Sequence, residues 1–176
     1  MRGSASRGQG RVEQVAASRD RLAGQRQLQL HRTEEHDVDE TKVAELRIRR
    51  QQRLGDPDFQ GMTAVMTEGV IRTVVGGSEV MREQLNHLLE VSRSLPVSVH
   101  VLPFAVTPPG SDNLVIFEFP HELDNEVVYV DSDTAKCIHE EREPVRKCTY
   151  TFHAALAQAL NPTASQDLIR SVMKEL

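Results

Sequence analysis

Apolar residues recur at regular spacing along most of the chain after residue 38. In the segment "VDETKVAELRIRRQQRLGDPD", Val43 and Leu46 lie on one helical stripe, and Ala44 and Ile48 lie beside it. This spacing predicts a helix, because positions three and four apart share a face. The sequence Gly55-Asp56-Pro57 predicts its end.

The next segment, "MTAVMTEGVIRTVV", is rich in β-branched residues and predicts a strand over Met62–Val75, with Gly69 as a point of interruption. The turn Val75-Gly76-Gly77 leads into a helix for which Ser78 is the expected cap. The apolar stripe of that helix comprises Met81, Leu85, Leu88 and Leu89.

Three strand-like runs follow, then a weaker one, and the chain closes with two helical patterns. The strands are predicted at Val97–Leu102, Leu114–Phe119, Glu126–Val130 and, more weakly, Ala135–His139. One helix is predicted from Pro144 to a stop at Asn161-Pro162, and the last in "SQDLIRSVMKEL". The order predicts an α/β (α+β) fold, with a mixed, largely antiparallel sheet of four to five strands and helices packed against it.

Residues 1–37 differ from the rest in composition and charge. They are rich in Arg, Gln, Gly and Ser, so we expect a basic, mostly disordered arm, although a short helix around Arg11–Leu22 is compatible with the pattern. Residues 1–32 carry seven arginines against two acidic residues, whereas the remainder has 14 basic and 24 acidic residues. Any attraction to nucleic acid is therefore expected from the arm, because the acidic body repels phosphate.

The 176-residue length fits one domain, residues 38–176, after the arm. No apolar run is long enough to span a membrane, and no secretory signal precedes the body. Cys137 and Cys148 do not make a disulfide framework. We therefore expect a cytoplasmic protein.

The Gly76-Gly77 turn raises the question of a phosphate site. No basic residue precedes Arg82, and Glu79 lies in the first helical turn, where it repels an anion. The G-x-x-x-x-G-K-[ST] and G-x-G-x-x-G patterns are both absent. A tight turn is the favoured interpretation.

Other candidate chemistry is weak. The histidines and cysteines have no zinc-ligand spacing, and no nucleophile motif is present, so we expect no metal, no cofactor and no catalytic residue. Glu118, within the apolar "VIFEFP", is a general acid or base if it points inward and a solvated residue if it does not. The basic run from Arg47 to Arg53 shares its helix with acidic residues and is typical of a solvated face.

Several segments together resemble one family. They are the Val75-Gly76-Gly77 turn, Met81-Arg82-Glu83-Gln84-Leu85, Val101-Leu102-Pro103-Phe104, Phe117-Glu118-Phe119-Pro120 and Val128-Tyr129-Val130. In this order they resemble the C-terminal domain of unknown function of actinobacterial XRE-type helix-turn-helix regulators, some of them Scr-type and toxin–antitoxin-linked. The resemblance covers about Thr41 to Leu176.

The resemblance implies a sensor or effector module that modulates a DNA-binding head, often with a small partner protein. It supplies no catalytic or ligand residue. Members of the family place a helix-turn-helix ahead of this domain, whereas residues 1–40 show no two-helix apolar pattern. We therefore expect a truncated regulator without its head and without specific DNA binding of its own.

Three functional hypotheses remain open. The leading one is a non-enzymatic regulatory domain that binds a partner or forms a homodimer through the first helix or the loop Phe104–Asp112. The candidate partner or ligand residues are Phe104, Pro108, Pro109, Glu118 and Tyr129. The second is a small-ligand binder or enzyme with a pocket at the strand ends, using Glu118, His100 or Tyr129. The third makes the arm a salt-sensitive tether for nucleic acid.

Overall fold

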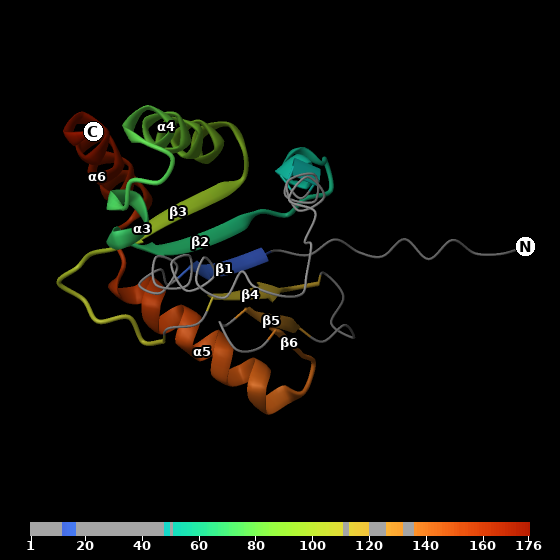
Figure 1. Cartoon of the computed structure of the whole chain (residues 1–176). Helices are drawn as coiled ribbons and strands as arrows, with labels where there is room; N and C mark the ends of the chain where they lie inside the picture. Colours follow the sequence, from blue (N-terminus) through green and yellow to red (C-terminus); the bar gives the residue numbers. More distant parts are fainter. Residues whose placement is uncertain (1–11, 17–47, 50, 111–112, 120–125, 132–135) are drawn as a thin grey trace, which may run out of the picture.

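A computed structural model describes residues 12–16, 48–49, 51–110, 113–119, 126–131 and 136–176 (Figure 1). Its strands are β1 (Val12–Ala16), β2 (Met62–Thr67), β3 (Val97–Leu102), β4 (Asn113–Phe117), β5 (Val127–Asp131) and β6 (Lys136–His139). Its helices are α3 (Glu68–Arg72), α4 (Ser78–Ser94), α5 (Arg142–Gln158) and α6 (Pro162–Glu175), with a 3₁₀ turn η1 at Arg53–Gly55. Residues 48–49 and 51–52 are also helical, within the first predicted helix. No helix of the described residues is long and apolar enough to cross a membrane.

The strands pair in the order β3-β2-β1-β4-β5-β6. The pairs β1–β2 and β2–β3 are parallel, whereas β4 pairs antiparallel with both β1 and β5, and β5 with β6. A parallel pair, β2 and β3, and an antiparallel set, β4 to β6, are thus joined through the backbone of β1. The mixed α/β class is confirmed, but the predicted sheet of four to five strands is not.

Helices cover the two faces of the sheet differently (Figure 1). Alternation along β3 points Val97, Val99 and Val101 toward α4 and α6, and these valines are buried. The same cluster contains Ile71, Met81, Leu85, Leu89, Ile169 and Val172. We call this side the α4–α6 face.

Helix α5 covers the opposite side, which we call the α5 face, and contacts β1 to β5. Its core comprises Val65, Leu102, Leu114, Ile116, Val128, Val145, Phe152 and Ala155. Because these residues come from β2 to β5, α5 packs against both the parallel and the antiparallel parts of the sheet.

The strand predicted over Met62–Val75 is too long. Strand β2 ends at Thr67, and α3 follows at once, with Glu68 and Arg72 paired at 2.6 Å across one helical turn. Ile71 on this short helix is buried in the α4–α6 core. Local pairing and burial therefore override the β-branched composition of the segment.

The double-glycine turn before α4 is present, but it follows α3 rather than a strand. Gly76 and Gly77 have φ values of 76° and 96°, which a side chain rarely allows, and α4 begins at Ser78. Gly77 occupies the cap position and no side chain caps the helix, so the expected capping role of Ser78 is wrong.

The C-terminal helices both begin earlier than predicted. Helix α5 starts at Arg142, so Pro144 lies in its first turn. Proline is tolerated there because the backbone N–H groups of the first turn make no hydrogen bond within the helix. Asn161 and Pro162 start α6 rather than ending α5, because the Asn161 side chain accepts a 2.9 Å hydrogen bond from the backbone N–H of Ala164.

Of the arm, the structure describes only Val12–Ala16, which form the strand β1 rather than the short helix that the pattern also allowed around Arg11–Leu22. The boundary between arm and domain, at residues 37 and 38, lies outside the described residues.

Phe152 should dominate the stability of the α5 face, because it is fully buried between α5 and the sheet. Phe152→Ala is expected to lower the free energy of unfolding by about 3–5 kcal/mol through the cavity that it leaves. Tyr150→Ala, on the same helix but 76% exposed, should cost less than about 0.5 kcal/mol. Urea denaturation of both variants measures the difference, and equal losses would contradict this view of the core.

Candidate functional site

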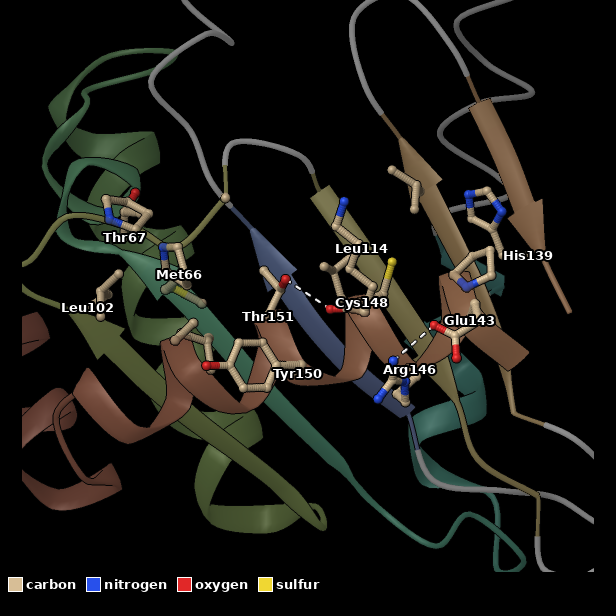
Figure 2. A pocket seen from close by; sticks show the side chains of 18 residues that line it. Met66, Thr67, Leu102, Leu114, His139, Glu143, Arg146, Cys148, Tyr150 and Thr151 are labelled. Atoms are coloured by element: carbon tan, nitrogen blue, oxygen red, sulfur yellow. Dashed lines mark hydrogen bonds and ion pairs between the residues drawn. The ribbon is translucent and has the colours of Figure 1, made fainter. Parts of the chain in front are cut away.

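A groove of about 910 Å³ lies between α5 and the ends of the strands (Figure 2). Thr67 and Leu102, the last residues of β2 and β3, line it together with Leu114 near the start of β4 and Val130 near the end of β5. The site is therefore at the carboxyl ends of the parallel strands, where ligands commonly bind in α/β sheets.

The floor of the groove is apolar. Val65, Leu102, Leu114 and Ala155 line it and are almost fully buried, so they hold their positions through the core of the α5 face. Residues of β2, β3 and β4 meet there although they are distant in the sequence. An apolar molecule in the groove would thus touch both parts of the sheet.

One wall is the loop that leaves β3. Pro108, Pro109 and Gly110 line the groove, and a Cβ added at Gly110 would lie 3.3 Å from Cγ2 of Thr151. This close approach brings the loop against α5. The structure thus places Pro108 and Pro109, two of the candidate residues, at the groove.

The polar wall is formed mainly by α5. The side chains on this wall belong to Glu143, Arg146, Lys147, Tyr150 and Thr151, at helical spacings of one or two turns. Arg146 pairs with Glu143 at 2.9 Å, and both side chains are mostly exposed. The hydroxyl of Thr151 donates a 3.0 Å hydrogen bond to the backbone carbonyl of Lys147.

The groove has an apolar end and a polar end. Figure 2 shows Met66, Thr67 and Leu102 at one end, and His139 and Glu143 at the other. Within the part of the chain that the structure describes, no three His, Cys, Asp or Glu side chains gather to hold a metal ion. The chemistry that this arrangement supplies is apolar contact along the floor and charge or hydrogen bonding at one mouth.

The polar groups of the second hypothesis do not meet at the groove. His100 lies on β3 near the α5–α6 connection, where its Nδ1 donates a 3.0 Å hydrogen bond to the carbonyl of Leu160. In the neutral ring, Nε2 then accepts from the hydroxyl of Ser98 at 2.8 Å. These contacts give His100 a role in joining β3 to the helical layer.

Glu118 and Tyr129 are also away from the groove. Glu118 follows the end of β4 and is half-buried. Tyr129 stands opposite Val115 and Ile138 in the register of the sheet, on the side away from α5. Neither residue lines the groove.

Phe104, the remaining candidate, is on the surface and is held by its backbone. Its side chain is 62% exposed, and its N–H donates a 3.0 Å hydrogen bond to Oε2 of Glu68. Glu68 also accepts from Arg72 at 2.6 Å, and Arg72 reaches Glu175 on α6 at 2.7 Å. This chain of contacts ties the loop after β3 to α3 and α6.

Glu68 is the central charge of that network. Burial raises the pKa of its carboxyl group, but the hydrogen bonds from the Phe104 N–H and from Arg72 outweigh it, so the pKa is lowered from its usual value. The pKa of Arg72 is raised, chiefly by its hydrogen bonds to Glu68 and Glu175. Both groups therefore favour their charged forms in the folded protein.

The groove residues on α5 and β6 were not predicted from the sequence. The sequence predicted a helix from Pro144 onward, but not that the side chains of Glu143, Lys147 and Tyr150 lie over the strand ends. Their spacing of four and three positions indicates that they share one face of the helix. Their position over the sheet depends on the order of the strands, which cannot be derived from the spacing of apolar and polar residues.

Comparison with known proteins gives one match. A family model described as "Domain of unknown function (DUF5753)" matches residues 23–171. The chain has no significant match among curated proteins or among solved structures. The matched segment contains β2 to β6 and α3 to α5, and therefore all the groove residues, whereas β1 precedes it.

The Glu68 network predicts a stability difference that depends on pH. At neutral pH, Glu68→Gln is expected to lower the free energy of unfolding by about 1 kcal/mol, because charge-assisted hydrogen bonds to Phe104 and Arg72 are weakened. The folded-state pKa of Glu68 is lowered, so the advantage of the wild type is complete above the unfolded-state pKa. It disappears as the pH falls through the folded-state pKa.

Chemical denaturation across this pH range measures the effect, with Glu83→Gln on the exposed side of α4 as the matched control. A difference between wild type and Glu68→Gln that stays constant as the carboxyl groups titrate would contradict the assignment.

Proposed function

Because the chain belongs to the DUF5753 family, whose function is not defined, we propose from the groove that it is a non-enzymatic sensor domain. A small molecule in the groove would act as the effector. The resemblance to the C-terminal domains of XRE-type regulators supports a DNA-binding helix-turn-helix head as the element that such a domain controls. A small partner protein is the alternative target.

The observation that supports this proposal best is that both parts of the sheet and α5 contribute apolar residues to the groove. Val65 and Leu102 come from the parallel part of the sheet, Leu114 and Val130 from the antiparallel part, and Ala155 from α5. A volume of about 910 Å³ is in the range of sites for drug-sized ligands. The described lining offers mainly contact surface, which favours binding over chemistry.

Strand β1 offers a route from the groove to the preceding chain. Its backbone pairs with β2 on one side and β4 on the other, and both neighbours supply groove residues. A ligand that contacts both β2 and β4 binds most tightly when β1 is paired between them. Its binding therefore shifts the equilibrium toward the state in which β1 is paired. Since β1 precedes the matched domain, its pairing would report ligand binding toward the N-terminal side.

A ligand screen with a blocked groove tests the sensor function. We expect at least one small metabolite to raise the melting temperature of the full chain in a saturable way, because a ligand that binds the folded state stabilises it. Thr151→Phe should abolish this shift, since Thr151 lines the groove and a larger ring would fill it. His153→Phe, on the same helix but exposed and outside the groove, should retain it.

Thermal shift with both variants measures the outcome. A stabilising compound that acts equally on Thr151→Phe and on wild type would place its site elsewhere. The absence of any stabilising compound across a broad metabolite screen would count against the sensor function itself.

A protein-interaction role is the second candidate, favoured by the exposure of Phe104. A 62% exposed phenylalanine whose backbone is fixed by Glu68 is suited to anchor an interface, because aromatic anchors contribute most when their position is set before binding. Val74, Val75 and Val80, near the start of α4, are exposed as well. The simplest such partner is a second copy of the chain.

Sedimentation velocity tests this role over a concentration series. If Phe104 anchors a dimer, Phe104→Ser should weaken self-association by at least about tenfold, as for a central aromatic contact. Tyr150→Ser, which changes another exposed aromatic residue, should leave it unchanged. A wild-type chain that stays monomeric throughout, or equal effects of the two variants, would contradict a Phe104 dimer.

A further inference from the structure

The charges along the groove are not evenly matched. Among the described lining residues, Arg146 and Lys147 are cationic and Glu143 is the only carboxylate. Arg146 and Glu143 pair with each other at 2.9 Å. No described carboxylate lies within ion-pairing distance of Lys147, so its ammonium group remains available to a ligand at the groove.

This local excess of positive charge is opposite in sign to the net charge of the chain. The chain as a whole carries a net charge of −5, and its residues after position 32 are more acidic still. Anions are therefore repelled by most of the surface but not by this mouth of the groove. His139, which also lines the polar end, can donate a hydrogen bond to an anion without adding a negative charge.

The opposite end of the groove suits a hydrocarbon. Leu102 lies there, and Val65, Leu114 and Ala155 continue the apolar floor toward α5. A wholly polar ligand would lose its hydration against these residues without compensation. A wholly apolar ligand would leave Lys147 unused.

We propose that the groove binds a small amphipathic carboxylate, such as a medium-chain or aryl-substituted acid. Its apolar body lies along Val65, Leu102 and Leu114, and its carboxylate pairs with Lys147 on α5. The inference rests on the proposed sensor function and specifies the chemical class of its effector. Lys147 acts as the group that selects for the anion, and the apolar floor supplies most of the binding energy.

An isosteric series of probes tests this assignment with the full chain: octanoate, 1-octanol and octylamine at neutral pH. We expect octanoate to bind at least as tightly as 1-octanol and more tightly than octylamine, measured by calorimetric titration. If the groove offered no cation to the ligand, 1-octanol would bind more tightly than octanoate, because the carboxylate would lose its hydration without compensation.

Two lysine variants separate a local contact from the overall charge. Lys147→Met should weaken octanoate binding about fivefold, the effect of one exposed ion pair, and leave 1-octanol binding unchanged. Lys174→Met removes the same charge from the end of α6, outside the groove, and should leave both unchanged. Equal losses in the two variants, or an unchanged preference in Lys147→Met, would overturn the role of Lys147.

The probes also distinguish this inference from the proposed function. If 1-octanol or octylamine binds more tightly than octanoate in the wild type, the carboxylate class is wrong, but the groove remains a ligand site. If none of the three probes binds, the inference is overturned. If the wider metabolite screen is silent as well, the sensor function fails with it.

Discussion

The packing of α5 across the sheet is the interaction on which the rest of the molecule depends. The sheet joins a parallel pair of strands and an antiparallel set, and the only strand between them is β1. Backbone pairing through five residues is a narrow connection. Helix α5 reinforces it, because Phe152 and Ala155 pack in one buried cluster with Val65 of β2 and with Leu114 of β4.

This arrangement separates stability from binding. On the α4–α6 face, α4 and α6 cover β3 and bury a continuous aliphatic cluster. On the α5 face, the core fills only part of the space, and its edge becomes the floor of the groove. Since the same residues serve as core and as floor, a ligand there acts on the contact that joins the two parts of the sheet. The proposed route through β1 follows from this shared use.

Residues with strong periodicity were predictable from the sequence. The alternation of Val97, Val99 and Val101 gave the bounds of β3, and the spacing of Met81, Leu85 and Leu89 identified the buried side of α4. Burial on one face enforces both patterns, so local sequence carries them.

Features that depend on tertiary context were not predictable. Strand β1 lies in a segment poor in large apolar residues, and its pairing depends on strands 46 or more positions away in the sequence. The groove joins Thr67, Leu114 and Lys147, which only the strand order and the crossing of α5 bring together. Pro108 and Pro109 were predicted as candidates in the loop Phe104–Asp112, but their place at the groove depends on the fold.

The most direct test of a groove that binds a small effector is an amide-resolved NMR titration of the full chain with octanoate. We predict saturable chemical-shift changes at the ends of β2 and β3, at Leu114 and along α5 from Glu143 to Thr151, and smaller changes in α4. Shifts confined to α4 and α6, or no saturable shifts around the groove, would contradict it.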